Sequence, residues 1–140
     1  MWEWIEAGAT IYVCGELSLI MRSRDGGEVW EVLQAGANAS TGVSPTLSAI
    51  RMSESGLGFA VGQEGTVLRT RDGGDSWHPL DVGTHVNLLG VDVDADGRVL
   101  ISGMRAMFLS DNGGDDWQPV RSDDVDRGWY SEVALTGNGP

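Results

Sequence analysis

Carboxylates at alternate positions of one short segment are the residues whose spacing could bind a metal ion. Asp92, Asp94 and Asp96 precede Gly97, and alternating carboxylates ahead of a glycine turn could converge on one hard cation such as calcium. The twelfth position of such a loop requires a bidentate Glu, whereas this chain has Gly103 there. We therefore interpret the segment as a β-hairpin turn, with calcium binding as the alternative.

Nucleophiles and soft metal ligands are sparse in this sequence. The chain has one cysteine, Cys14, and two histidines, His78 and His85, which stand without partners at ligand spacing. A nucleophilic thiol needs an adjacent base, and no histidine follows Cys14 at a repeat-equivalent site. The sequence thus predicts no catalytic residues, no metal site and no cofactor.

Four arginines could recognise acidic groups, because a guanidinium pairs with carboxylates in a bidentate manner. Arg22 and Arg69 have the same place relative to a recurring Gly-Gly motif, as do Arg24 and Arg71. We predict that they form either a protein-binding patch for acidic loops or a solvated rim paired with nearby Asp and Glu.

Charge and hydropathy exclude several classes of partner. The formal net charge is -12, from 9 basic and 21 acidic residues, and such a field repels nucleic acids and anionic membrane surfaces. No apolar run reaches the roughly 18 residues of a membrane helix, so no membrane insertion is expected. The acidic, aromatic start at residues 1–6 does not resemble a secretory signal, and one cysteine allows no internal disulfide. These features predict a cytoplasmic or virion location.

An eight-residue box repeats three times and organises the whole chain. It has the form S/T-x-D/N-G-G-x-x-W, with tryptophans 47 (77 − 30) and 40 (117 − 77) residues apart, a period that suits propeller blades of four strands. Glycines permit positive φ in the turn, the Asp or Asn bonds to the turn's own backbone, and the tryptophan covers it. The structural residues of the boxes are Asp25, Gly27, Trp30, Asp72, Gly74, Trp77, Asn112, Gly114 and Trp117.

Short β-prone runs recur around each box and predict an all-β fold. First strands are expected near 50–52 and 91–93, second strands before Gly15, Gly62 and Gly103, third strands before each box and fourth strands after each tryptophan. We predict a single β-propeller segment, residues 1–140, of three four-stranded antiparallel blades plus a lone C-terminal strand. The expected ranges are about 1–38, about 44–83 and about 86–122 for the blades and 128–139 for the strand.

The box resembles the Asp-box or BNR repeat of sialidases and of the photosystem II stability/assembly factor family. The segment Thr70 to Trp77, preceded by residues 59–65, is most similar to the assembly-factor type. That resemblance implies a non-enzymatic propeller whose surface binds other proteins, with an Arg-rich patch in larger members. Small phage virion proteins also carry such repeats. The sialidase resemblance would imply a Tyr nucleophile, yet Tyr12 aligns with the core positions Phe59 and Leu100.

Three blades are fewer than the roughly four that a closed ring needs, so completion by oligomerisation is predicted. A C-terminal strand could complete the first blade of a neighbouring copy, giving a six-bladed homodimer. Aromatic residues outside the boxes are expected at that seam, although they could instead pack within their own blades. They are Trp2, Trp4 and Trp129, and Tyr130 beside Trp129 is a further candidate protein-binding residue.

The function predicted from these features is that of a non-catalytic structural or assembly protein acting through protein contacts. A phage virion component and an assembly factor are the two forms considered. The alternative is a glycan-binding or vestigial sialidase-like module, although matching the boxes transfers the fold rather than the catalysis.

Overall fold

The computed structural model describes residues 3–7, 10–34, 45–121, 128 and 133–135. Within these residues the chain forms twelve β-strands and two short 3-10 segments, and none of its helices is long and apolar enough to cross a bilayer. The strands make three four-stranded antiparallel sheets, each a meander in chain order. The predicted all-β fold of three antiparallel blades is therefore confirmed.

Each sheet corresponds to one copy of the sequence repeat, and we call the sheets blades 1 to 3. Blade 1 contains β1 (Glu3–Ala7), β2 (Thr10–Cys14), β3 (Ile20–Ser23) and β4 (Trp30–Gln34), with the 3-10 segment η1 at Glu16–Ser18. Blade 2 contains β5 (Leu47–Met52), β6 (Gly58–Gly62), β7 (Val67–Thr70) and β8 (His78–Leu80), with η2 at Gln63–Gly65. Blade 3 contains β9 (Leu88–Val93), β10 (Val99–Gly103), β11 (Ala106–Ser110) and β12 (Gln118–Pro119).

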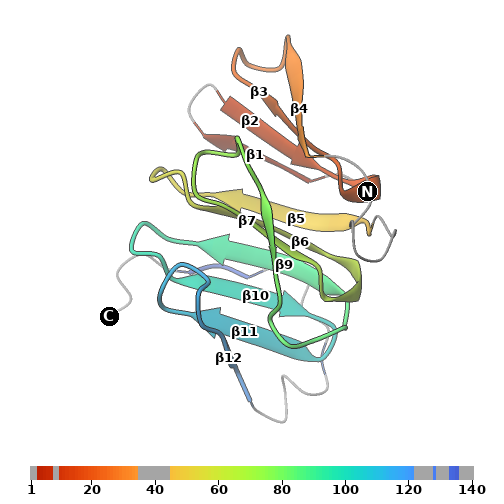
Figure 1. Cartoon of the computed structure of the whole chain (residues 1–140), viewed down its shortest axis with the longest axis vertical. Helices are drawn as coiled ribbons and strands as arrows, with labels where there is room; N and C mark the ends of the chain where they lie inside the picture. Colours follow the sequence, from red (N-terminus) through yellow and green to blue (C-terminus); the bar gives the residue numbers. More distant parts are fainter. Residues whose placement is uncertain (1–2, 8–9, 35–44, 122–127, 129–132, 136–140) are drawn as a thin grey trace.

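The blades follow one another along the long axis of the molecule in chain order (Figure 1). The first strand of each blade contacts the first strand of the next, β1 with β5 and β5 with β9. In a propeller the first strands line the central axis and the fourth strands lie outermost. The arrangement is therefore a partial propeller in which first strands lie side by side.

Strand register is the same in all three blades. Val13 pairs with Met21 between β2 and β3, Ala60 with Leu68 between β6 and β7, and Ile101 with Phe108 between β10 and β11. The strand register sets which face each side chain occupies, because alternate residues point to opposite faces. Equivalent residues of the repeat consequently face the same direction in every blade.

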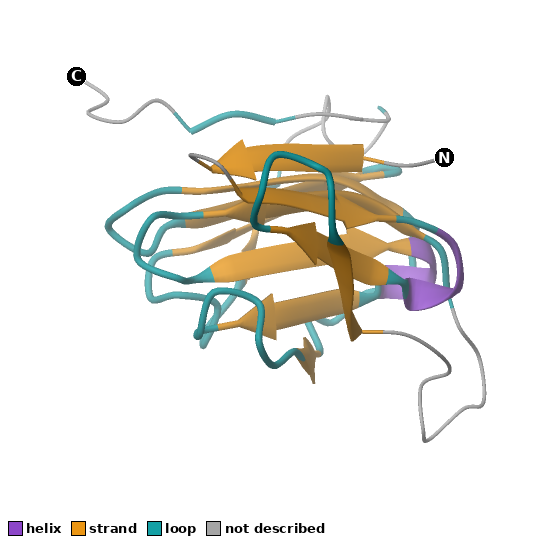
Figure 2. Ribbon diagram, turned by 90° about the horizontal axis from the view of Figure 1, so that it is seen from above, coloured by secondary structure: helices purple, strands orange, loops and turns teal. Residues whose placement is uncertain are grey.

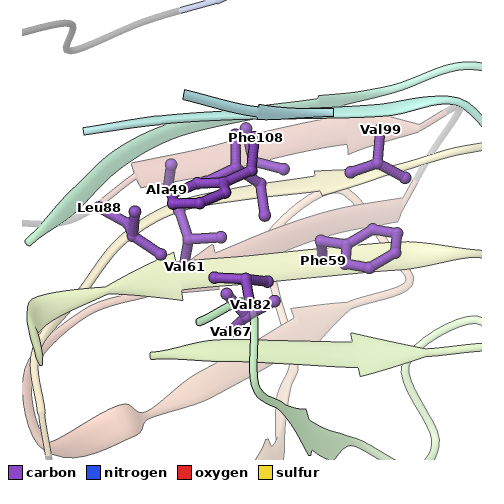
Figure 3. Close-up of a cluster of buried hydrophobic side chains, with 10 residues drawn as sticks. Ala49, Phe59, Val61, Val67, Val82, Leu88, Val99 and Phe108 are labelled. Atoms are coloured by element: carbon purple, nitrogen blue, oxygen red, sulfur yellow. The ribbon is translucent and has the colours of Figure 1, made fainter. Parts of the chain in front are cut away.

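Two hydrophobic cores fill the spaces between neighbouring blades, because the middle blade is apolar on both faces. All five residues of β6 are buried, with Phe59 and Val61 directed toward blade 3 and Ala60 toward blade 1. Figure 3 shows the core between blades 2 and 3, where Phe59, Val61 and Val67 lie with Leu88 and Val99. The blade 1 and blade 2 core consists of Tyr12, Cys14, Ile20, Leu47, Ile50, Ala60, Leu68 and Trp77.

The hairpin expected at the acidic segment is present between β9 and β10. The carboxylate of Asp94 accepts hydrogen bonds from the backbone N–H groups of Asp96 and Arg98 and from Arg98 Nε, at 2.7 to 3.0 Å. The hairpin's own backbone and Arg98 thus use the acceptor positions that a cation would require. Within the ranges described above, no group of three His, Cys, Asp or Glu side chains is placed to hold a metal.

The C-terminal strand expected at 128–139 falls mostly outside the described residues. Gly128 and Val133–Leu135 are described and have no strand assignment. Gly128 accepts a hydrogen bond from Arg105 N, and Leu135 N donates to Asp92 Oδ2, both at 2.6 Å. These contacts place Gly128 and Leu135 against blade 3. Pairing of a C-terminal strand with another copy stays a prediction.

Candidate protein-binding surface

The three box turns are closed by one recurring set of hydrogen bonds. In the second box, Thr70 Oγ1 donates to Asp72 Oδ1 and accepts from Gly74 N, while Asp72 Oδ1 also accepts from Ser76 N. Trp77 Nε1 then donates to Gly74 O at 2.9 Å. Ser23 and Asp25 of the first box, and Ser110 and Asn112 of the third, bond in the same way. The boxes are structural turns, as their sequence predicts.

The third box differs at its Asn and its Trp. Asn112 Nδ2 donates to Asp116 Oδ2 at 2.7 Å, a bond that an aspartate could not make. Trp117 packs edge-on against Phe59 of blade 2, with ring centroids 6.1 Å apart and planes at 89°. Its Nε1 is buried and has no hydrogen-bond partner among the described residues, whereas the indoles of Trp30 and Trp77 both donate to glycine carbonyls.

Acid should weaken the second box more than the third. Hydrogen bonds from the Ser76 side chain and backbone and from Thr70 hold the pKa of Asp72 at about 2, below its ordinary 3.8. Because the folded pKa is the lower one, ionised Asp72 stabilises the fold above pH 3.8, and this contribution is lost as pH falls toward about 2. The D72N variant, which copies the third box, should therefore show a flatter loss of unfolding free energy over that range. Urea titrations at several pH values measure it, and an unchanged pH slope would contradict the assignment.

The first predicted arginine joins two blades instead of facing solvent. Arg22 on β3 has a side chain only 5% exposed and donates to Gly73 O and Asp75 Oδ1 of blade 2, both at 2.8 Å. Its Nε donates to Glu31 at 2.7 Å within blade 1. Burial alone would lower the pKa of Arg22, but the hydrogen bonds to Glu31 and Asp75 raise it above the ordinary value. Tyr12 supports the same contact by donating to Gly73 O at 2.7 Å.

Arg69 repeats this arrangement between blades 2 and 3. Its Nη1 donates to Gly113 O at 3.1 Å and to Asp115 Oδ1 at 2.8 Å. The hydrogen bond from Arg69 holds the pKa of Asp115 below its ordinary range. We call this set, an arginine of one blade bound to the glycine carbonyl and carboxylate of the next box, the inter-blade clamp.

The other two predicted arginines are more exposed. Arg24 is 65% exposed and lies 3.2 Å from Glu31 and 3.7 Å from Asp75. Arg71 is 58% exposed and lies 3.0 Å from Asp115. All four arginines therefore lie near a carboxylate of the next box, but Arg22 and Arg69 are the more buried pair and also bind its glycine carbonyl.

The aromatic residues predicted at a seam lie largely outside the described part of the chain. Trp2, Trp129 and Tyr130 fall in ranges that the structure does not describe. Trp4 is described only as backbone, paired with Val13 between β1 and β2. Their role at a seam stays a prediction.

The end of the blades opposite the boxes carries a feature that the sequence interpretation missed. The turns between second and third strands lie there, and Figure 2 shows η1 and η2 side by side at this end. At the same turn position Leu17, Glu64 and Arg105 have φ of 58°, 58° and 62°, a left-handed conformation that costs a non-glycine residue about 1–2 kcal/mol. The three turns thus present an apolar, an acidic and a basic side chain, each on a residue with left-handed backbone.

Arg105 borders two hollows between the blade 2 to blade 3 connection and the β10–β11 turn. One has a volume of about 290 Å³ and is lined by Val86, Met107 and Phe108 among others. The other, of about 480 Å³, shares Val86 and Arg105 and adds His85. Within the described residues no hydrogen bond or ion pair involves the guanidinium of Arg105. Arg121 also lines the first hollow. A hollow with apolar side chains and arginines in its lining fits a ligand with an apolar part and an acidic or carbonyl group.

Comparison with known proteins identifies the family of this chain. The sequence profile of the photosynthesis system II assembly factor YCF48 matches residues 5–136. Similar solved structures include YCF48 bound to D1 peptide, at 22% identity and TM-score 0.63, and YCF48 from Cyanidioschyzon merolae, at 19% and 0.61; each aligns with 84% of this chain. An ancestral GH74 enzyme shares 18% identity over 89% of this chain and 18% of its own, with a TM-score of 0.64. No curated protein matches.

These structural likenesses concern the fold, because all of them lie below 25% identity. The chain spans 44% and 42% of the two YCF48 chains, less than half of their length. The profile match, by contrast, extends through all three repeats. The chain therefore belongs to the family of the photosynthesis system II assembly factor YCF48.

Proposed function

We propose that the chain is a non-catalytic propeller segment that binds a polypeptide at the turn end of blade 3, beside Arg105. The observation that carries the proposal is the guanidinium of Arg105, which lies without a partner among the described residues at the border of two hollows. Membership of the assembly-factor family supports a role in binding proteins. A related structure contains YCF48 bound to D1 peptide, which supports a peptide as the ligand.

The lining of the hollow offers contacts both for an apolar side chain and for an oxygen acceptor of a peptide. Val86, Met107 and Phe108 supply apolar walls, and Arg105 supplies donors for a carboxylate or a backbone carbonyl. A peptide with one acidic or C-terminal carboxyl group beside an apolar side chain fits both parts of the site.

Glycosidase function is not favoured by the position of the described tyrosine. Tyr12 is 6% exposed and its hydroxyl donates to Gly73 O, so the hydroxyl belongs to the interface between blades 1 and 2. The likeness to a GH74 enzyme shows the fold alone. Virion membership, cellular location and the six-bladed homodimer stay predictions, and light scattering of the purified chain measures the oligomeric state.

Replacing Arg105 by glutamine should weaken peptide binding by about tenfold or more, since a charge-assisted hydrogen bond contributes about 1.5–3 kcal/mol. The measurement is fluorescence anisotropy with a labelled D1 peptide, with R71Q as the matched control. Arg71 is exposed and lies in the box region at the opposite end of its blade, so R71Q should bind as the unmodified chain does. Weaker binding by R71Q with unchanged binding by R105Q would instead place the site on the exposed arginines near the boxes.

A further inference from the structure

The inter-blade clamp has a fixed direction along the chain. The donors lie on the earlier blade, where an arginine of the third strand pairs across strands with an aromatic residue of the second: Arg22 with Tyr12 and Arg69 with Phe59. The acceptors lie on the box of the later blade, a glycine carbonyl and a carboxylate two residues further on. Each described interface between blades thus needs a donor face and an acceptor face.

Blade 1 presents an acceptor face that no described part of the chain covers. Gly26 and Glu28 occupy the positions of Gly73 and Asp75, and within the described residues neither the Gly26 carbonyl nor the Glu28 carboxylate has a hydrogen-bond or ion-pair partner. Trp30 is 39% exposed, whereas the equivalent Trp77 is 8% exposed beneath blade 1. Val32, two residues after Trp30 on β4 and so on the same face, is 61% exposed.

Blade 3 lacks the donor face that would complement this acceptor. Leu109 stands where Arg22 and Arg69 stand, and its cross-strand partner is Leu100 in place of Tyr12 or Phe59. Asp111 replaces Arg24 and Arg71. If blade 3 of a second copy packed on blade 1 in the repeat geometry, Asp111 would lie beside Glu28. Two neighbouring carboxylates repel each other, and blade 3 would supply no guanidinium to neutralise them.

We propose that the exposed face of blade 1, formed by Gly26, Glu28, Trp30 and Val32, binds an Asp-box blade that carries Arg directly before its box and Tyr or Phe on its second strand. Charge complementarity identifies this occupant, because both described interfaces use that donor set and Glu28 supplies the matching carboxylate. Blade 3 of a second copy is not the occupant. The six-bladed head-to-tail homodimer is accordingly disfavoured by the chemistry of its seam.

The test installs the missing donors on blade 3 of the full chain and asks whether they bind the natural acceptor. The donor variant carries L100Y, L109R and D111R together with E28R, which disables its own acceptor. Mixed with the unmodified chain, it should form a one-to-one complex in sedimentation velocity. The affinity should exceed the self-association of either chain by on the order of tenfold or more, as expected for Arg–carboxylate hydrogen bonds.

Two controls make the result decisive. The single E28R variant replaces the unmodified chain as acceptor and should abolish the complex. A simpler donor carries L109R, D111R and E28R and keeps Leu100. It replaces the first donor if L100Y disturbs folding, which circular dichroism reports. The absence of a complex with either folded donor would overturn the proposal. So would a dimer of the unmodified chain that E28R dissociates.

Discussion

Replacing Phe59 by alanine should remove about 3–5 kcal/mol from the free energy of unfolding, a large part of the 5–15 kcal/mol typical of a domain. Phe59 is fully buried in the core between blades 2 and 3. Its ring contacts Trp117 edge-on and lies so close to Gly114 that a Cβ there would meet it at 2.9 Å. The truncation therefore leaves a cavity beneath the third box and removes an aromatic pair at once.

Urea unfolding followed by tryptophan fluorescence measures this loss. The V32A variant is the matched control, because Val32 is 61% exposed and its truncation should change the unfolding free energy by no more than about 0.5 kcal/mol. A loss below about 1 kcal/mol for F59A would mean that the two blades are not packed through this ring.

Replacing Gly62 by alanine should destabilise the chain by about 3 kcal/mol or more, because the added methyl group would force β5 away from β6 within blade 2. A Cβ at Gly62 would lie 2.1 Å from Thr46 O and 2.8 Å from Leu47 Cα. Both are backbone atoms at the start of β5, and Thr46 O already accepts a hydrogen bond from Gln63 N. The φ of Gly62 is -170°, so the expected loss comes from the steric clash alone.

The control for this substitution separates a clash from backbone strain. Gly73 has a φ of +72° and nothing within 4 Å of a Cβ placed on it. The G73A variant should therefore cost only the left-handed conformation, about 1–2 kcal/mol. Midpoints of urea unfolding rank the two variants, and a smaller effect for G62A than for G73A would show that the β5 backbone moves aside at little cost.

The repeat in the sequence was sufficient to predict the blades because its signals are local. The Gly-Gly turns, the Trp that follows and the serine or threonine before them all bond within a few residues of one another, as in the second box from Thr70 to Trp77. The alternation of apolar residues then gives the face that each strand buries. Turn chemistry of this kind depends little on distant parts of the chain.

The hydrogen-bond partners of the arginines could not be predicted in the same way. Arg22 and Arg69 were recognised as equivalent, yet both bind a backbone carbonyl and a carboxylate on the next box. Every residue has a backbone carbonyl, so the sequence does not indicate which one accepts the hydrogen bond. To identify the carboxylate, one must know how the two sheets pack side by side. Sequence spacing alone therefore left open whether these side chains bind partners or pair locally.

The sequence did not identify Arg105 because its turn is one residue shorter than in the other two copies. The repeat alignment therefore needs a gap at this turn. Its signal is the contrast with Leu17 and Glu64, which share the left-handed backbone but differ in side-chain chemistry. Positions where a repeated backbone carries unlike side chains are candidates for function, since packing does not dictate them. That comparison becomes possible only once the φ values are known.

The direction of the clamp has a consequence for the order in which the protein matures on the ribosome. Arg22 finds its acceptors 51 and 53 residues later in the chain, and Arg69 finds its own 44 and 46 residues later. Translation proceeds from the N-terminus, so Arg22 and Arg69 are synthesised before the glycine carbonyl and carboxylate that they bind on the next box. The interface between two neighbouring blades can therefore be completed only after the box of the later blade has been synthesised.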